Sequence, residues 1–249
     1  MDTGSAGVDS PASIAALERC VAGLDWTRIA ADLERCGYAT IAGLLAPPLC
    51  AALTARWADE AGYRRHIVME RHGYGRGEYK YYSYPLPATV QALRSTFYAR
   101  LAPIADRWHE VLRLPSGFPP EHRDYLARCH AAGQRRPTPL ILRYGPDDYN
   151  RLHQDLYGEH VFPLQVAVLL SRPGAGFTGG EFVLTGQRAR MQSQVDVVPL
   201  GQGDAVIFAV NDRPEAGARG IHRVRMRHGI SRVRSGRRFT LGVIFHDAT

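Results

Sequence analysis

The spacing of apolar residues divides the chain into two parts near Pro137. Before that residue, apolar side chains recur every three or four positions in several stretches, which is the period of an amphipathic helix. After it, short runs rich in Val, Ile, Leu and Phe alternate with Gly, Pro, Asp and Asn, as in strands joined by turns. The pattern therefore predicts a mostly helical first half and a β-rich second half.

The first half contains several candidate helices with recognisable ends. Residues 38–45 form a candidate strand between two of the helices, and residues 63–87 a β-hairpin around Gly73–Gly77. No regular element is predicted for residues 1–12, which we expect to be disordered. The predicted helices cover residues 14–24, 26–37, 47–63, 88–112 and 121–133, with Gly37 and Gly62 as stops.

The second half contains about eight short strands separated by regular turn residues, the number in a double-sheet jelly roll. We therefore predict an α+β fold in which a jelly roll, or double-stranded β-helix, over residues 137–249 is buttressed by the mostly helical residues 13–136. Since no flexible linker separates the two parts, we expect one composite domain. The candidate strands are 139–144, the run at His153, 163–171, 180–185, 195–200, 204–210, 220–227 and 237–246.

Composition places the chain among ordinary globular proteins, because it is 45% hydrophobic and 22% charged. No apolar run approaches the roughly 18–20 residues that cross a bilayer. The first residues have neither a basic start nor an apolar run, so we expect no signal peptide. The four cysteines are scattered, which favours reduced thiols and a cytoplasmic location.

The charge distribution is uneven. The net charge is +7, and nearly all the basic residues are arginines. Eight arginines and no acidic residue lie between Arg219 and Arg238. A basic surface of this kind suits a polyanion such as nucleic acid, although many basic faces are merely solvated.

The candidate chemistry begins with His153 and Asp155. Two residues apart on an extended chain, they point to the same side and could grip one ion. A histidine from another strand would complete a 2-His-1-carboxylate triad, which binds Fe(II) and leaves open positions. In the strand 220–227 the even positions face inward and the odd positions after Ile221 are arginines, so His222 is the predicted third ligand. His228 has the same parity but falls in a predicted turn, 228–231, and is not expected to bind metal.

That turn also suggests a site for a second ligand. If residues 228–231 reverse the chain, His222 lies opposite Arg238, whose guanidinium could hold the remote carboxylate of a dicarboxylic co-substrate. Arg237 or Arg232 could serve instead. Each feature also has an ordinary explanation: a lone His-x-Asp is often coincidental, His222 could be a core histidine, and Arg238 could pair with an aspartate.

From about Leu140 to His246 the chain resembles the catalytic core of the Fe(II)/2-oxoglutarate-dependent dioxygenases. The matching stretches are "RYGPDDYNRLHQD", "FTGGEFVL", "VVPLGQGDAVIF", "GIHRV" and "RRFTLGVIF". The resemblance implies that His153, Asp155 and His222 bind Fe(II), that Arg238 binds 2-oxoglutarate, and that Tyr144 contacts this co-substrate. It also implies that O₂ is consumed while 2-oxoglutarate becomes succinate and CO₂.

The hairpin 63–87 is the candidate substrate surface, because its cations could contact phosphates and its aromatic rings could stack on unpaired bases. A hairpin with one face packed on the core is the simpler interpretation. The whole chain is also similar to a bacterial family predicted to demethylate alkylated DNA bases. We therefore expect alkylated DNA or RNA as the partner and formaldehyde as a product. The candidate substrate contacts are Arg71, Tyr74, Arg76, Tyr79, Lys80 and Tyr81.

Two other functions fit parts of the sequence. Known alkylated-base repair dioxygenases have two arginines six residues apart on one strand; Arg232 and Arg238 have this spacing, but Ser235 and Gly236 lie between them. The run "RRFTLGVIF" is closer to prolyl hydroxylases, which favours hydroxylation of a protein side chain as an alternative. A non-catalytic jelly-roll binding module is the third possibility, and the complete set of candidate ligands argues against it.

Overall fold

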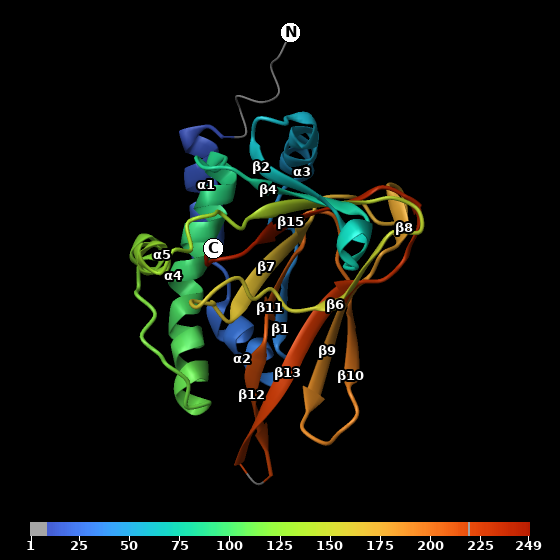
Figure 1. Ribbon diagram of the computed structural model, residues 1–249. Coiled ribbons are helices and arrows are strands. Elements are labelled where there is room, and N and C mark those ends of the chain that lie inside the picture. Colours follow the sequence, from blue (N-terminus) through green and yellow to red (C-terminus); the bar gives the residue numbers. More distant parts are fainter. Residues whose placement is uncertain (1–8, 219) are drawn as a thin grey trace.

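The computed structural model describes residues 9–218 and 220–249 and shows two antiparallel sheets packed across one hydrophobic core (Figure 1). The major sheet has the strand order β1-β11-β7-β15-β5-β4-β2, and the minor sheet has the order β10-β9-β13-β6-β3, with β12 paired to β13. Strands β8 and β14 form a separate small pair. The predicted α+β fold with a jelly-roll core is confirmed.

The elements have the following bounds. The helices are α1 (Pro11–Ala22), α2 (Trp26–Cys36), α3 (Pro47–Ala55), α4 (Ala88–Val111) and α5 (His122–Ala131), with two 3₁₀ turns, η1 (Arg56–Ala58) and η2 (Met69–His72). The strands of the first half are β1 (Tyr38–Ile41), β2 (Tyr63–Val68), β3 (Gly75–Arg76) and β4 (Glu78–Tyr82). Those of the second half are β5 (Leu140–Tyr144), β6 (Tyr149–His153), β7 (Leu164–Leu169), β8 (Phe177–Gly179), β9 (Phe182–Arg188), β10 (Gln194–Val198), β11 (Ala205–Ala209), β12 (Asp212–Gly217), β13 (Gly220–Ile230), β14 (Val233–Gly236) and β15 (Arg238–Val243).

Helix ends follow local sequence signals in most cases. The Asp25 side chain caps α2 by accepting a hydrogen bond from the Arg28 amide, and Gly37 ends the helix in a left-handed conformation with φ 80°. Helix α1 begins at Pro11, so the predicted disordered tail was too long by at least two residues, while residues 1–8 lie outside the described chain. The predicted helix over 47–63 is also shorter, because α3 gives way to η1.

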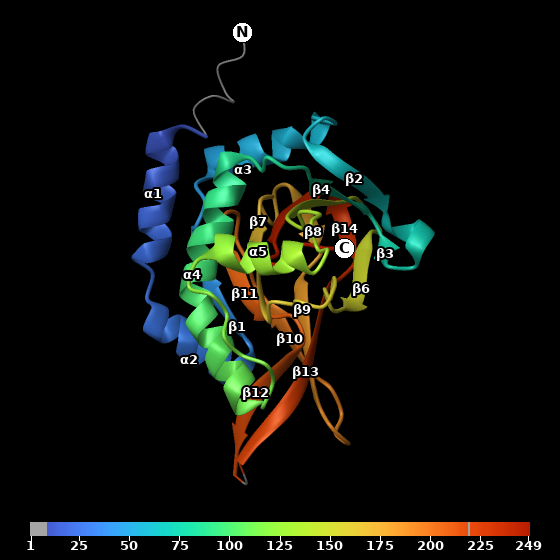
Figure 2. The same ribbon diagram turned by 60° about the vertical axis from the view of Figure 1, so that its left-hand side comes forward.

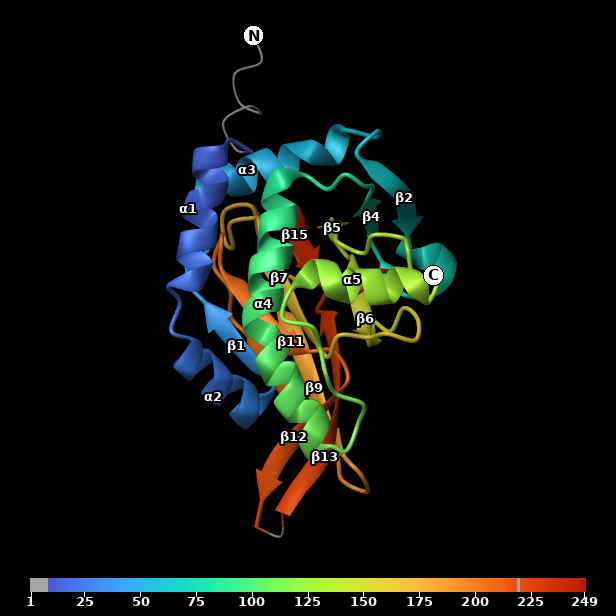
Figure 3. The same cartoon turned by 90° about the vertical axis from the view of Figure 1, so that its left-hand side faces the viewer.

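The helices cover the outer face of the major sheet. Figures 2 and 3 show α4 crossing this face, with α1 and α5 beside it. Buried residues on α4, among them Val90, Leu93, Phe97 and Leu101, belong to the same core as the sheet residues. No helix in the described part of the chain has both the length and the apolar character needed to cross a bilayer.

The first half of the chain also supplies strands to the major sheet. Strand β1 pairs with β11 at one edge, while β4 pairs with β5 and carries β2 beyond it. The predicted β-hairpin is therefore an extension of the jelly-roll sheet. It lies at one edge of the major sheet and lines the cavity between the sheets.

The predicted turn at residues 228–231 is wrong. Strand β13 continues through it to Ile230, pairing first with β12 and then with β9 and β6. The glycine that suggested a turn, Gly229, instead permits close packing of strands, since a Cβ there would lie 2.7 Å from the Asn150 carbonyl oxygen. The β9–β10 and β12–β13 hairpins project together from one end of the molecule (Figures 1 and 3).

Candidate metal and co-substrate site

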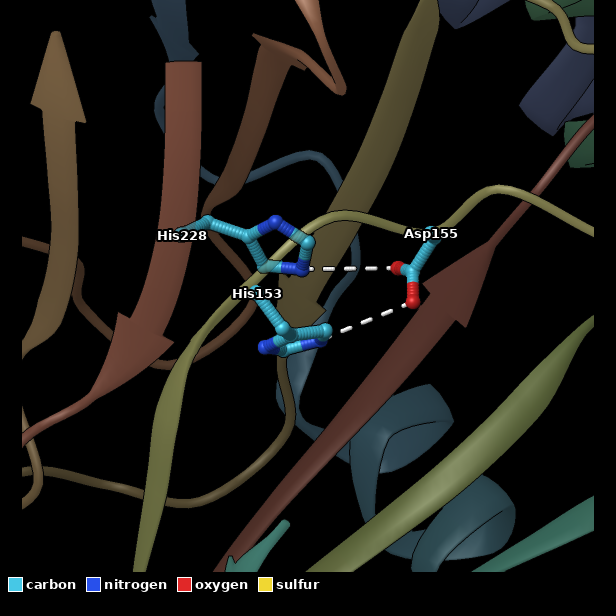
Figure 4. A group of neighbouring side chains, drawn as sticks. All are labelled: His153, Asp155 and His228. Carbon is cyan, nitrogen blue, oxygen red and sulfur yellow. Dashed lines mark ion pairs between the residues drawn. The ribbon is translucent and has the colours of Figure 1, made fainter. Parts of the chain in front are cut away.

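Three side chains from two paired strands meet between the sheets. His153 ends β6, Asp155 follows two residues later, and His228 lies on β13 directly opposite His153 in the ladder. The His153 Nε2 atom is 3.5 Å from Asp155 Oδ1, and the His228 Nε2 atom is 3.4 Å from Asp155 Oδ2 (Figure 4). Donor atoms of all three residues lie within 4.8 Å of one another. One ion could therefore contact all three.

The protonation states of these three side chains favour the binding of a cation. Burial raises the pKa of the Asp155 carboxyl, but hydrogen bonds and charges from His153 and His228 outweigh this and hold that pKa well below its usual value. Burial lowers the pKa of His228, and the neighbouring His153 lowers it further. Burial also disfavours charged His153, but Asp155 outweighs burial and raises the His153 pKa. A metal ion bound here would take the place of that proton.

The surroundings of the three residues orient them for coordination. The His153 Nδ1 atom lies 2.7 Å from the Arg151 carbonyl oxygen, so it carries the proton and leaves Nε2 free to bind. The intervening Gln154 donates from its amide to the Met226 carbonyl oxygen at 2.8 Å, which ties the loop to β13. Two imidazoles and a carboxylate on one side are a facial triad, and we propose His153, Asp155 and His228 as iron ligands.

His222, the predicted third ligand, lies elsewhere. It pairs with Glu215 of β12 in the projecting hairpin, and its ring packs where a Cβ on Gly217 would have to lie. Six residues separate it from His228, which is about 20 Å along an extended strand. The inward parity assigned to both histidines is correct. The error was the assumed turn, which removed His228 from the strand and made His222 the nearest inward histidine.

Arg238 and Tyr144 lie where a co-substrate next to this triad could be held. They are opposite each other on β15 and β5, both are buried, and both line the cavity that contains the triad. Burial lowers the pKa of Arg238 to about 10, so the guanidinium is still charged at neutral pH. Among the described residues its Nε atom has no hydrogen-bond partner, and Nη1 donates to the Thr240 hydroxyl. A buried cation with a free donor fits a ligand carboxylate.

The two alternative arginines, Arg237 and Arg232, lie away from this position. Arg237 is exposed, and Arg232 contacts the ring of Tyr149 and the carboxylate of Asp147. Of the three arginines considered, only Arg238 lines the cavity. Gly180, with φ 65°, makes room for it, because a Cβ there would lie 2.9 Å from the Arg238 Cδ atom. Steric contact with Arg238 thus explains why the second glycine of "FTGGEFVL" has no side chain.

The cavity around these groups has a volume of about 620 Å³ and extends from the triad to the β2–β4 hairpin. Tyr74, Tyr79 and Tyr81 line it, as the sequence suggested for this hairpin. Arg71, Arg76 and Lys80 do not. Strand alternation turns Lys80 to the opposite face, where its Nζ atom donates to the Trp57 carbonyl oxygen and pairs with Glu60. Besides Arg238, the arginines that line the cavity are Arg64, Arg65, Arg136 and Arg151.

Tyr157 is a further site residue that the sequence did not indicate. Its hydroxyl donates to Asp155 Oδ1 at 2.6 Å, and the edge of its ring packs against Tyr81. Burial and the Asp155 charge raise the pKa of Tyr157, so the phenol keeps its proton and donates. This hydrogen bond leaves Asp155 Oδ2 available for a metal.

Comparisons with known proteins agree with this geometry. A family model described as "Oxygenase, catalysing oxidative methylation of damaged DNA" matches residues 77–248. An uncharacterized protein of Mycobacterium tuberculosis is 48% identical over 164 residues, covering 66% of this chain and 70% of the relative. The chain belongs to this family of oxygenases.

Solved structures show the same fold at low sequence identity. A prolyl hydroxylase from Trichoplax adhaerens, in complex with a peptide fragment, has a TM-score of 0.52 and 10% identity over 96% of this chain and 94% of its own. A Pseudomonas putida prolyl-4-hydroxylase has a TM-score of 0.50 and 14% identity, over 90% and 99% of the two chains. The expected enzyme class is confirmed, because the protein belongs to a family of oxygenases and is therefore an oxidoreductase, and it shares its fold with these hydroxylases.

Substitution of the two candidate third ligands separates them. His228→Ala removes a donor and should weaken Co(II) binding, used as a spectroscopic substitute for Fe(II), by roughly 100-fold or more. His222→Ala is the matched control and should bind Co(II) as the unaltered protein does. Equal loss of binding in both variants, or loss only in His222→Ala, would remove His228 from the ligand set.

Tyr157→Phe tests the hydrogen bond to Asp155. Without the phenol the carboxylate is free to rotate, so we expect Co(II) affinity to fall by about 10- to 100-fold. Tyr74→Phe removes the hydroxyl of an exposed tyrosine at the edge of the cavity and should leave the affinity unchanged. A titration of the metal-free protein gives both affinities, and an unchanged affinity in Tyr157→Phe would show that the bond does not position the ligand.

Proposed function

We propose that the enzyme oxidatively demethylates alkylated nucleic-acid bases, using Fe(II), 2-oxoglutarate and O₂. Together these three components would oxidise a C–H bond of the substrate while 2-oxoglutarate is converted to succinate and CO₂. The chain's own residues would hold the iron through His153, Asp155 and His228. Arg238 would bind the remote carboxylate of 2-oxoglutarate, with Tyr144 beside it.

The observation that carries this proposal is the combination of cations and tyrosines around the cavity. Arg64, Arg65, Arg136 and Arg151 line it, and in the described part of the chain none of them forms an ion pair with a carboxylate. Unpaired guanidiniums suit phosphate groups, which accept their paired N–H donors. Such a cluster fits a nucleotide better than a neutral side chain of a protein.

The tyrosines supply the complementary apolar surfaces. Tyr79 and Tyr81 are neighbours in the cavity wall, and exposed Tyr74 stacks on His72 at its edge, with ring centroids 5.4 Å apart. Any unpaired base can stack on such rings, because every base has an aromatic face. The cavity of about 620 Å³ is large enough for a base and a dicarboxylate together.

The chemistry favours removal of a methyl group. Insertion of one oxygen atom into an N-methyl C–H bond gives a carbinol, which breaks its C–N bond and releases formaldehyde, leaving the N–H base. The second oxygen atom enters succinate. An oxidative reaction of this kind takes a methyl group away, and we therefore assign the reaction on damaged DNA as demethylation.

Arg238→Ala should raise the KM for 2-oxoglutarate while leaving Co(II) affinity unchanged. Loss of a charge-assisted contact costs about 1.5–3 kcal/mol, which corresponds to a rise of roughly 10- to 150-fold. Arg237→Ala removes an adjacent exposed arginine and should leave the KM unchanged. Succinate formation at varied 2-oxoglutarate concentration gives the KM of each variant. A KM raised by Arg237→Ala and not by Arg238→Ala would make Arg237 the residue that binds the carboxylate.

The proposed reaction is tested by incubating the protein with Fe(II), 2-oxoglutarate and oligonucleotides that carry N-methylated bases. We expect formaldehyde in a one-to-one ratio with the demethylated base, and none with the His228→Ala variant. Unmethylated oligonucleotides are the control. Hydroxylation of a proline-containing peptide, with no formaldehyde from any oligonucleotide, would refute the assignment and support protein hydroxylation.

A further inference from the structure

The outer face of the minor sheet carries a row of arginines that the cavity does not use. On β13, Arg223, Arg225 and Arg227 are exposed, while Val224 and Met226 between them are buried in the core. Alternate residues on a strand are about 6.6–6.8 Å apart, so the row is evenly spaced and about 13 Å long. The row faces outward because side chains alternate along β13, and the same alternation points His228 inward.

The row lies beside a second group of cations at the tip of the β9–β10 hairpin. Arg188 and Arg190 line a shallow groove of about 340 Å³ together with Arg223 and Arg225. Arg188 lies opposite the buried Val224 and therefore belongs to the inner side of the sheet. We call the outward-facing set Arg190, Arg223, Arg225 and Arg227 the arginine face. It combines the β9–β10 turn with β13, and β9 and β13 lie side by side in Figure 1.

One carboxylate offsets only part of this charge. Asp212 contacts Arg223 at 3.2 Å and Arg225 at 3.6 Å, so it is shared by two guanidiniums. Glu215 pairs instead with Arg188 and the buried Arg213, on the inner side of the sheet. The face therefore has an excess of positive charge, which a polyanion would balance.

The rest of the surface suits a chain of nucleotides. On β9, Arg225 lies opposite the exposed Gln187, and Arg227 lies opposite the buried Thr185. Exposed Val195 on β10 lies opposite Thr185 and extends the same face. Cations for phosphates thus adjoin hydrogen-bonding and apolar side chains that bases or sugars could contact.

The arginine face and the cavity share strand β13 but lie on its opposite sides. Arg227 precedes the candidate iron ligand His228 and points to the opposite side of the same strand. The neighbouring strand β6 carries Arg151, which is exposed and lines the cavity. A strand of nucleic acid could therefore lie along β13 and pass over β6, with one base turned into the cavity.

We propose that the arginine face binds the sugar–phosphate backbone of the nucleotides that flank the base in the cavity. This inference rests on the proposed function and deepens it, because it makes the substrate a polynucleotide. A free base or nucleotide would fill the cavity without reaching the arginines on the other side of β13. Phosphate contacts of this kind supply affinity that falls steeply with salt.

The test uses the double variant R225Q/R227Q and single-stranded methylated oligonucleotides of roughly 3 and roughly 15 nucleotides, which fall below and near the upper end of common site sizes. Fluorescence anisotropy gives Kd over a range of salt concentrations, and formaldehyde release gives turnover. The variant R19Q, on α1 at the opposite side of the molecule, is the matched control. Thermal unfolding checks that each variant is folded.

We expect the double variant to bind the longer oligonucleotide at least 10-fold more weakly, with a slope of log Kd against log salt that is smaller by about 1–1.5. Binding and demethylation of the short oligonucleotide should be unchanged, as should all properties of R19Q. If R225Q/R227Q binds the long oligonucleotide as tightly as the unaltered protein, the arginine face is not a binding surface, while demethylation still stands. If the unaltered protein neither binds nor demethylates any oligonucleotide, both proposals fail together.

Discussion

The pairing of β6 with β13 is the constraint on which the candidate site depends. It places His153 opposite His228, and Asp155, two residues beyond the end of β6, then faces both rings. Asp155 and His228 are buried at this point beside the half-buried His153, which is unfavourable unless the three groups satisfy one another or a cation does so. The low pKa of Asp155 expresses this mutual stabilisation. A metal ion would satisfy the same donors.

Alternation along β13 gives that strand two roles. Its inward residues Val224 and Met226 join the core and lead to His228, while its outward arginines stay in solvent. A shift of the register by one residue would bury arginines and expose the histidine, so the buried core enforces the position of both sets. If the arginine face binds nucleic acid, the same strand connects backbone binding with the iron site.

The two sheets hold different parts of the catalytic apparatus. The minor sheet carries the candidate metal ligands, and the major sheet carries Arg238 and Tyr144 opposite each other on β15 and β5. The hairpin of β2 and β4 continues the major sheet beyond the jelly roll and adds its tyrosines to the cavity wall. The cavity between the sheets is thus bounded by elements from both halves of the chain.

Local sequence patterns were sufficient to predict most elements and the facing of their side chains. The period of apolar residues identified the helices and strands, and the two-residue spacing of His153 and Asp155 indicated a ligand pair. The turn argument that set Arg238 opposite His222 was wrong, because Arg238 lies opposite Tyr144 on β5, but the inward parity of the histidines on β13 also followed from the sequence. These are properties of residues within about one element's length of each other.

Only the tertiary structure decided which histidine meets the pair. Both His222 and His228 have the inward parity, and the choice depends on where β13 pairs with β6, a contact between residues 75 positions apart in the case of His153 and His228. Tyr157 and the orientation of Lys80 depend in the same way on packing between distant segments. Parity is a local consequence of the extended backbone, whereas register is set by the whole core.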